Sequence, residues 1–490
     1  MLFNSLEFAF FLAIVFIIYW FVINKNILNQ NMFLLLASWF FYGCWDWRFL
    51  FLLIIISFLN YFIGIKIDRS KVSIKKKFWL LAGIIFDIGI LGVFKYYNFF
   101  IQSFIDLASL AGYNLPKSST SIVIPLGISF YIFLSLSYIL DIYKKHLTAN
   151  FNIIEVLLTL SFFPIILAGP IQRPSLLLPQ IDEKREFKYD QAIDGMRQIL
   201  WGLFVKIAVA DNLAPPVDDI FLNFSHYSGS TLFLGSLSYT IQIYADFSGY
   251  SNIAIGTGKL LGFNLMRNFD FPYFSRDITE FWKKWHISLT TWFRDYLFLP
   301  ISCAISWKIK HEKVFYIKTD LLIYIIASIV VWFITGLWHG ANYTFIVWGL
   351  IHGGFLIIYQ WQRKPRKKFF NLIGINNNNI VVVSIERVIT LLIIIMAWVI
   401  FRSDSILKAA EYFKGLFSSS LFSSPQVFPG IAILISTIFI LTEYIQRNKS
   451  HALQLENIKN RVVRWGIYIV IVFVILLFGG GDQKFIYFQF

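Results

Sequence analysis

Long runs of apolar residues, separated by short polar segments, dominate this sequence of 490 residues. Most runs are apolar on every helical face, whereas a water-soluble helix would carry a polar stripe. Helices of about 20 such residues are long enough to cross the hydrocarbon core of a bilayer. We therefore predict membrane-spanning helices at residues 6–23, 31–43, 49–65, 78–94, 122–140, 196–210, 232–247, 320–338, 341–361, 383–401, 428–445 and 462–478.

The composition agrees with a lipid environment. Hydrophobic residues make up 57% of the chain and charged residues 14%, whereas about 25% of a soluble protein is charged. The net charge is +15, but the Lys and Arg residues fall between the apolar runs, as in cytoplasmic loops, and form no nucleic-acid-binding face. We predict an all-α, multi-pass protein of the cell membrane. Its single integral-membrane domain would comprise residues 1–490, with a core at 120–402 and C-terminal helices and a tail at 403–490.

The basic loops determine the predicted orientation. Clusters of Lys and Arg lie at 66–77, 144–145, 363–368 and 447–464. They share one side of the membrane if residue 1 is outside, and basic loops remain in the cytoplasm. Both termini are then extracytoplasmic, and the connection 263–318 is cytoplasmic. The first apolar run contains Glu7 and follows no basic segment, so we predict a retained helix and not a signal peptide.

Two segments depart from simple crossings. Charged loops expected in the cytoplasm flank residues 153–168 on both sides, and Pro164 with the break Gly169-Pro170 suits a re-entrant hairpin surrounded by protein. The alternative is a full crossing with a charged extracytoplasmic loop. Residues 281–296 mix charged and aromatic side chains at helical spacing, which favours a helix in the membrane interface.

Candidate chemistry is concentrated in two Trp-His pairs. His286 lies in the sequence FWKKWHISLTTWFRDY, and His339 follows an apolar span in the sequence GLWHG. A neutral imidazole can take a proton from a hydroxyl group and return it to a leaving group. Buried histidines of membrane proteins often only hydrogen-bond a neighbouring helix, and we keep this structural interpretation for His352. His339 differs because Trp338 and Asn342 stand beside it among glycines.

The segment around His286 combines cations with aromatic rings. Lys283, Lys284 and Trp285 precede the histidine, which fits an entrance for an anionic thioester donor. On a helix, Trp282, Trp285 and Leu289 would share one face. The alternative is an interface helix whose lysines extend to the lipid headgroups.

Asp246, in the sequence YADFSGY, is a further candidate for substrate binding. A charged group at membrane depth costs about 2.5–3.5 kcal/mol and needs a partner, so a purely structural hydrogen-bonding role stays open. Pairings such as H-x-x-x-H or H-E-x-x-H are missing from the sequence, and we predict no metal. Cys44 and Cys303 show neither disulfide nor metal-binding spacing.

Eight segments, in order, resemble the membrane-bound O-acyltransferase (MBOAT) family, in particular the bacterial branch that O-acetylates alginate and peptidoglycan. They are MLFNSLEFAFF at the start, PLGISFYIFLSLSYILDIYKK at 125–145, AGPIQRPSLLLPQI at 168–181, VKIAVADNLA at 205–214, IYADFSGYSNIAIG at 243–256, FWKKWHISLTTWFRDYLFLP at 281–300, GLWHGANYTFIVWGLIHG at 336–353 and the terminal FIYFQF. The resemblance implies a ring of transmembrane helices around a central channel, with re-entrant and interfacial helices.

The resemblance also implies an activity and its residues. His339 matches the catalytic histidine and His286 the second histidine of the family. Acetyl-CoA would donate its acyl group on the cytoplasmic side, and the group would cross the channel to a hydroxyl of a cell-envelope glycan, often through an extracytoplasmic SGNH-type transferase. We expect substrate contacts from Trp285, Lys283, Lys284, Trp338, Asn342 and Asp246.

Two alternatives stay open at this point. D-alanyl transfer from a carrier protein to a wall polymer is an alternative activity, and a transporter or flippase of an acylated substrate is an alternative class. From topology alone, His286 belongs to the cytoplasmic mouth and His339 lies nearer the outer boundary. We therefore expect two separate points on a transfer path and not one compact pair. The aromatic C-terminal tail is a candidate docking element.

Overall fold

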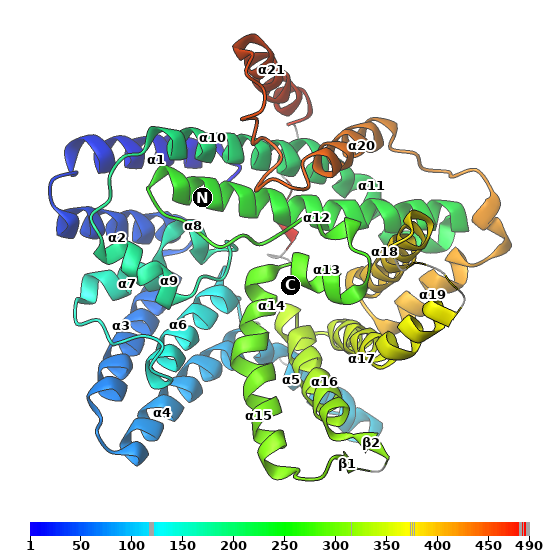
Figure 1. The fold of residues 1–490 in the computed structure, drawn as a ribbon, viewed down its shortest axis with the longest axis horizontal. Helices are drawn as coiled ribbons and strands as arrows, with labels where there is room; N and C mark the ends of the chain where they lie inside the picture. Colours follow the sequence, from blue (N-terminus) through cyan, green and yellow to red (C-terminus); the bar gives the residue numbers. More distant parts are fainter. Residues whose placement is uncertain are drawn as a thin grey trace. The chain divides into compact units, whose positions relative to one another are not determined.

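The computed structural model describes residues 1–116, 122–314, 316–372, 374, 376, 378–479, 483 and 485–486. The regular secondary structure of this part of the chain is helical except for a hairpin of β1 (Lys313–Val314) and β2 (Ile317–Lys318) (Figure 1). Seven stretches within it are long and apolar enough to cross a membrane: Trp47–Arg69, Ser73–Leu110, Tyr189–Leu222, Thr319–His339, Tyr343–Phe369, Ile380–Arg402 and Arg461–Phe478. Shorter apolar helices cover Leu6–Val22, Ile128–Tyr143, Ile153–Ile166 and Gly430–Ile445. The predicted all-α membrane protein is confirmed.

Eight of the described helices begin where a polar side chain replaces a missing backbone partner. An oxygen of the residue before the helix accepts a hydrogen bond from an N–H group of the first turn, which stabilises the helix end by about 1 kcal/mol. The capping residues include Ser5, Asn26, Asp46, Asn152, Asp277, Asn379, Ser405 and Asn460. These polar residues separate the apolar runs of the sequence.

The described chain forms two compact units. The first comprises Met1–Leu203 with Tyr250–Met266, and the second comprises Phe204–Gly249 with Arg267–Phe490. The helix α12 (Gly229–Leu260) contributes residues to both. The single domain expected from the sequence stays a prediction.

The first unit contains the N-terminal helices. Its elements are α1 (Leu6–Ile17), η1 (Ile18–Val22), α2 (Ile27–Gly43), α3 (Trp47–Arg69), α4 (Ser73–Leu91), η2 (Gly92–Tyr96), α5 (Tyr97–Leu110), α6 (Ile128–Tyr143), α7 (Ile153–Ser161), α8 (Phe163–Ile166), α9 (Pro174–Asp182) and α10 (Tyr189–Leu203). The helices α3, α4 and α6 pack against one another (Figure 1). Aromatic rings of Phe8, Phe11, Phe41 and Phe163 fill the space between α1, α2 and α8.

Residues 153–168 form a broken helix pair. The backbone leaves the helical conformation at Phe162, so α7 ends at Ser161, and α8 restarts with Pro164 in its first turn. At 1.5 Å per residue, α7 is about 14 Å long, whereas a crossing needs about 30 Å. Every side chain from Glu155 to Ala168 is buried. These features favour the predicted re-entrant hairpin over the full crossing.

The second unit contains the two Trp-His pairs. Besides most of α12, its elements are η3 (Phe204–Ala210), α11 (Asp211–Leu222), η4 (Phe224–His226), η5 (Pro272–Phe274), α13 (Ile278–Lys284), α14 (Ile287–Phe293), η6 (Arg294–Phe298), α15 (Leu299–Lys308), the hairpin β1–β2, α16 (Thr319–His339), α17 (Tyr343–Leu372), α18 (Ile380–Arg402), α19 (Ile406–Leu416), η7 (Ser419–Phe422), α20 (Gly430–Ile445) and α21 (Arg461–Phe478).

The helices α16 and α17 run side by side after a short connection (Figure 1). Two glycines allow their backbones to approach. A Cβ atom on Gly336 would lie 2.3 Å from the carbonyl oxygen of Phe345, and one on Gly349 would lie 2.3 Å from that of Trp332. Because both neighbours are backbone atoms, only glycine fits at these positions. The contact fixes the end of α16, where His339 lies.

Several predicted boundaries were wrong by a few residues or more. The span predicted at 122–140 begins only at Ile128, and that predicted at 232–247 is part of the longer α12. The span predicted at 341–361 continues as α17 to Leu372. Hydrophobicity marks the part of a helix that fits the bilayer, whereas the helix itself continues through charged residues that are also good helix formers.

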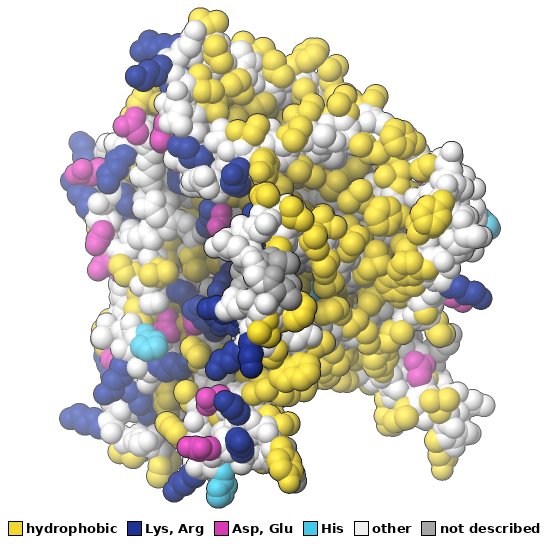
Figure 2. Space-filling view, turned by 45° about the vertical axis from the view of Figure 1, so that its right-hand side comes forward, with side chains coloured by type: hydrophobic (Ala, Val, Ile, Leu, Met, Phe, Trp, Pro, Cys, Tyr) yellow, Lys and Arg dark blue, Asp and Glu magenta, His cyan; other side chains and the backbone are white. Residues whose placement is uncertain are grey.

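The surface carries the apolar side chains expected in lipid. Large hydrophobic residues are exposed along the spanning helices, including Phe10, Ile85, Leu392, Leu434 and Val462. Figure 2 shows hydrophobic side chains over broad areas of the visible face and Lys and Arg side chains gathered in other areas. Apolar areas of this extent are unfavourable in water and mark contact with a membrane.

Candidate active site

His286 lies at a break between two short helices. Asp277 caps α13, and its Oδ1 accepts hydrogen bonds from the N–H groups of Thr279 and Glu280. The helix ends at Lys284, and His286 adopts the left-handed conformation (φ 43°, ψ 53°) before α14 begins. Few non-glycine residues adopt this conformation, which costs energy that the surroundings must supply. The single helical face predicted for residues 281–296 is therefore wrong at this point, although Trp285 on that face is buried.

Asn268 holds the imidazole of His286. Nδ1 of His286 lies 3.0 Å from Oδ1 of Asn268, which also accepts a hydrogen bond of 2.9 Å from the Ser288 hydroxyl. The backbone N–H of Ile287 donates to the carbonyl oxygen of the same Asn268 (2.8 Å). Because an amide oxygen can only accept, Nδ1 carries the proton and Nε2 carries the lone pair. His286 is 0% exposed and lies outside the membrane-spanning helices, and burial lowers its pKa to about 3.

His339 is the last residue of α16 and is enclosed by aromatic rings. Its ring centroid lies 5.0 Å from that of Trp338, 4.9 Å from Trp348 and 5.3 Å from Phe401, and the residue is 4% exposed. Trp348 belongs to α17 and Phe401 to α18. Three consecutive spanning helices therefore converge on this imidazole.

Trp338 joins the two histidines. Its ring centroid lies 5.9 Å from that of His286 and 5.0 Å from that of His339. The expected separation of the histidines into two points on a transfer path is therefore wrong, because one indole ring contacts both. Sequence spacing could not reveal this, because the break after α13 turns His286 toward the end of α16.

A third histidine, His352, belongs to the same cluster. Nε1 of Trp282 donates a hydrogen bond to Nδ1 of His352 (3.3 Å), a contact between α13 and α17 of the kind that the structural interpretation predicts. Its ring also lies 4.8 Å from that of Trp348, which contacts His339 as well. This proximity was not predicted from the sequence. The spacing of four between Trp348 and His352 places them on one face of α17 and could have indicated it.

The expected donor contacts occupy different environments. Lys283 is exposed, and Lys284 is half-buried and forms an ion pair of 2.7 Å with Glu280. Trp285 is buried, and its ring contacts those of Phe269 and Trp398. Of these three residues, only the two lysines are accessible for binding an anion at the surface.

Asn342 is engaged in the connection between α16 and α17. Its side-chain amide donates to the carbonyl oxygen of Asp404 (2.8 Å), and its Oδ1 accepts from the N–H of Thr344 (3.1 Å). Both polar groups of the side chain thus hold the backbone beside His339.

Asp246 belongs to a buried ion cluster of α12, η3 and α11. Its Oδ1 lies 2.6 Å from Nζ of Lys206, which also lies 2.6 Å from Oδ1 of Asp211. The cluster lines a small polar cavity, together with Arg402 and Gln483 among others. The predicted charge at membrane depth is therefore ion-paired with Lys206, which Asp246 shares with Asp211.

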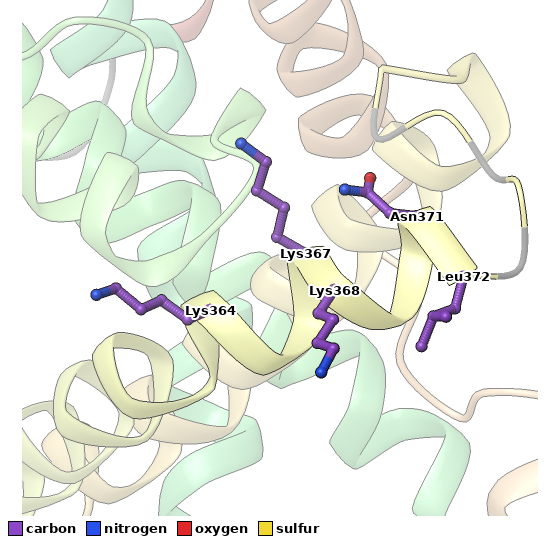
Figure 3. Close-up of a pocket in the computed structure, with 5 residues that line it drawn as sticks. All are labelled: Lys364, Lys367, Lys368, Asn371 and Leu372. Carbon is purple, nitrogen blue, oxygen red and sulfur yellow. The ribbon is translucent and has the colours of Figure 1, made fainter.

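A separate basic depression lies at the C-terminal end of α17. It has a volume of about 410 Å³, is open to the surface and is lined by Lys364, Lys367, Lys368, Asn371 and Leu372. Figure 3 shows the three lysines pointing in different directions from the helix. These lysines belong to the basic cluster 363–368, which is predicted to face the cytoplasm. None of the three contacts the aromatic cluster around His286 and His339.

The comparisons with known proteins decide the class. The family model described as MBOAT, membrane-bound O-acyltransferase family, matches residues 143–401, which include both Trp-His pairs. The chain belongs to the membrane-bound O-acyltransferase family. It is 36% identical to the probable alginate O-acetylase AlgI of Pseudomonas aeruginosa over 85% of this chain and 75% of that protein.

Other members of the MBOAT family are also similar. The peptidoglycan O-acetyltransferase of Helicobacter pylori is 32% identical over 85% of this chain and 80% of that protein. The teichoic acid D-alanyltransferase of Bacillus subtilis is 28% identical over 50% of this chain and 61% of that protein. This MBOAT protein is thus a multi-pass membrane O-acyltransferase related to alginate and peptidoglycan O-acetylases. Family membership argues against the transporter alternative.

Proposed function

We propose that this MBOAT protein transfers an acetyl group from cytoplasmic acetyl-CoA, across the membrane, for O-acetylation of a cell-envelope glycan such as peptidoglycan or an exopolysaccharide. The observation that carries the proposal is the enclosed aromatic cluster in which Trp338 contacts both His286 and His339. Such an enclosure excludes water, which would otherwise hydrolyse a reactive thioester.

In this mechanism His339 is the general base. A hydroxyl oxygen of the acceptor attacks the thioester carbonyl carbon, and the imidazole of His339 takes the hydroxyl proton. The C–S bond of the donor then breaks, and the proton passes from the imidazolium to the departing thiolate. The new C–O ester and free CoA are the products. General base catalysis of this kind contributes about 10²–10⁴-fold to the rate.

The other residues bind and orient the donor. Nε2 of His286, which carries the lone pair, accepts a hydrogen bond from the donor while Asn268 fixes the ring. Lys283 and Lys284 attract the phosphates of acetyl-CoA from the cytoplasm, and Trp285 and Trp338 form apolar walls. Asn342 supports the loop beside His339. An extracytoplasmic SGNH-type transferase is the proposed partner that completes delivery to the glycan.

The degree of similarity favours acetyl over D-alanyl transfer. The probable alginate O-acetylase matches 85% of this chain at 36% identity, whereas the D-alanyltransferase matches 50% at 28%. Purified protein with radiolabelled acetyl-CoA should release free CoA and form labelled product with a glycan acceptor. A requirement for a small acidic carrier protein instead of acetyl-CoA would contradict the proposal.

The first prediction concerns His339. His339→Ala should reduce O-acetylation of the envelope glycan at least about 100-fold, because the general base is lost. The measurement is mass spectrometry of acetylated wall and capsule fragments from cells with equal amounts of membrane-inserted protein. His226→Ala is the matched control, because His226 is exposed at the end of η4. Wild-type acetylation by His339→Ala would refute the assignment.

A further inference from the structure

The ion cluster of Lys206, Asp211 and Asp246 lies deep in the second unit. Lys206 and Asp246 are each 2% exposed, and Lys206 contacts both carboxylates at 2.6 Å. Two carboxylates with one ammonium leave one negative charge in excess. A buried charge is tolerated only when further hydrogen bonds satisfy it, so the cluster needs a donor from elsewhere in the chain.

A C-terminal segment, described at Gln483, Phe485 and Ile486, supplies that donor. The backbone N–H of Ile486 donates to Oδ2 of Asp246 at 2.7 Å, across 240 positions of sequence. Nζ of Lys206 donates to the carbonyl oxygen of Gln483 at 3.4 Å. Phe485 and Ile486 are buried, although they lie in an aromatic tail that we expected to be a docking element. Both carboxylate oxygens of Asp246 are therefore used within the chain.

The same segment contacts the wall of the candidate active site. The ring centroid of Phe485 lies 5.8 Å from that of Phe247, and the ring of Phe247 lies 4.7 Å from the imidazole of His286 in an edge-to-face arrangement. Phe247 directly follows Asp246 in α12. One turn of α12 thus binds the segment through Asp246 and contacts His286 through Phe247.

We propose that Asp246 and Lys206 form an anchor that holds Phe485 and Ile486 in place, with the ring of Phe485 against Phe247, and so keeps the imidazole of His286 in place. Asp246 is then a positioning residue and not a substrate-binding one. The anchor itself follows from the contacts within the second unit, whereas its effect on catalysis rests on the proposed function.

The first experiment measures whether Asp246 anchors the segment. Ile486→Cys in a Cys44→Ser/Cys303→Ser background gives a single cysteine whose backbone N–H still reaches Asp246. The side chain at position 486 is 5% exposed, so a maleimide should label it slowly in the detergent-purified protein. Asp246→Ala should accelerate labelling at least about tenfold, since a hydrogen bond to a charged group is lost and the segment opens more often.

Matched variants distinguish loss of the anchor from a general loosening of the structure around the cavity. Asp218→Ala removes the ion-pair partner of Arg402, which lines the same cavity, and leaves the contacts of the segment intact. The labelling rate of this variant should stay within twofold of that of the parent protein with Ile486→Cys alone. Asp246→Asn keeps an oxygen acceptor and should accelerate labelling less than Asp246→Ala. It also serves as the test variant if Asp246→Ala does not fold. Equal labelling rates in folded Asp246→Ala, or Asp246→Asn, and their parent would overturn the anchor.

The second experiment tests positioning. Asp246→Ala should lower kcat about tenfold and leave KM for acetyl-CoA within about twofold, and Asp246→Asn should restore part of kcat. A rise in KM with unchanged kcat would instead show substrate binding by Asp246 and overturn the positioning role. The labelling measurement needs no acyl transfer. Failure of the proposed function would therefore appear in the His339→Ala experiment, whereas failure of the anchor would appear in the labelling rates.

Discussion

At the scale of single residues, the two histidines are held by different forces. Polar contacts with Asn268 orient His286 and select its tautomer, whereas three aromatic rings enclose His339. The sequence marked both histidines because each follows a tryptophan between apolar or basic residues. The role of Asn268, 18 positions before His286, was not predicted, because asparagine is common in connections for many structural reasons.

The second prediction concerns Asn268. Asn268→Ala should lower kcat about 10- to 100-fold with a smaller effect on KM, because the ring of His286 loses its fixed orientation and tautomer. Steady-state kinetics of the purified protein with acetyl-CoA measures both constants. Asn371→Ala, at an exposed position near the end of α17, is the control and should leave both unchanged. An equal effect of the two substitutions would contradict the positioning role.

The paired variant Asn268→Asp tests the same contact through pH. Burial lowers the pKa of His286 to about 3, so the wild-type imidazole stays neutral from about pH 5 to 8. Its protonation therefore does not reduce the activity of the wild-type protein as the pH falls through this range. A carboxylate beside Nδ1 favours the protonated ring and raises its pKa. The variant should then lose activity as the pH falls through the raised pKa. Identical pH–rate profiles for both proteins would contradict this contact.

At the scale of elements, short helices and close helix packing position the site. The break between α13 and α14 brings His286 to Trp338, and the glycine contact between α16 and α17 places His339 beside Trp348. The sequence predicted the helices well because their hydrophobicity is local information. It did not predict the break, since the left-handed conformation of His286 is stabilised by contacts with Asn268.

The third prediction concerns the glycine contact. Gly349→Ala should destabilise the protein by about 1–3 kcal/mol and reduce activity, because the added methyl group overlaps the carbonyl oxygen of Trp332. Gly354→Ala in the same helix is the control, because nothing lies within 4 Å of its added Cβ. That substitution should be neutral or slightly stabilising, since alanine favours helices over glycine. Thermal unfolding in detergent measures both, and similar shifts would contradict the packing argument.

At the scale of the whole molecule, the chain is a multi-pass membrane protein whose basic loops are expected in the cytoplasm. Two native cysteines, Cys44 and Cys303, are free and exposed, and they lie in connections assigned to opposite sides. Cys44 would be extracytoplasmic and Cys303 cytoplasmic. The orientation can therefore be tested without adding any residue.

The fourth prediction concerns this orientation. A membrane-impermeant maleimide should label Cys44 in right-side-out vesicles and should label Cys303 only after the vesicles are permeabilised. Cys44→Ser and Cys303→Ser each leave one site and assign the signal. Detergent-solubilised protein gives the reference labelling of each cysteine. Labelling of Cys303 before permeabilisation, with Cys44 protected, would show that the termini are cytoplasmic.

The sequence by itself determined the membrane class, the approximate positions of the apolar helices and the two Trp-His pairs. These features depend on the burial of apolar side chains in lipid and on motifs of a few residues, both of which are local. The tertiary structure alone decided that Trp338 joins the histidines, that Asn268 orients His286 and that Ile486 binds Asp246. Each of these contacts joins segments far apart along the chain, so it depends on how the helices pack, and no local pattern of hydrophobicity specifies it.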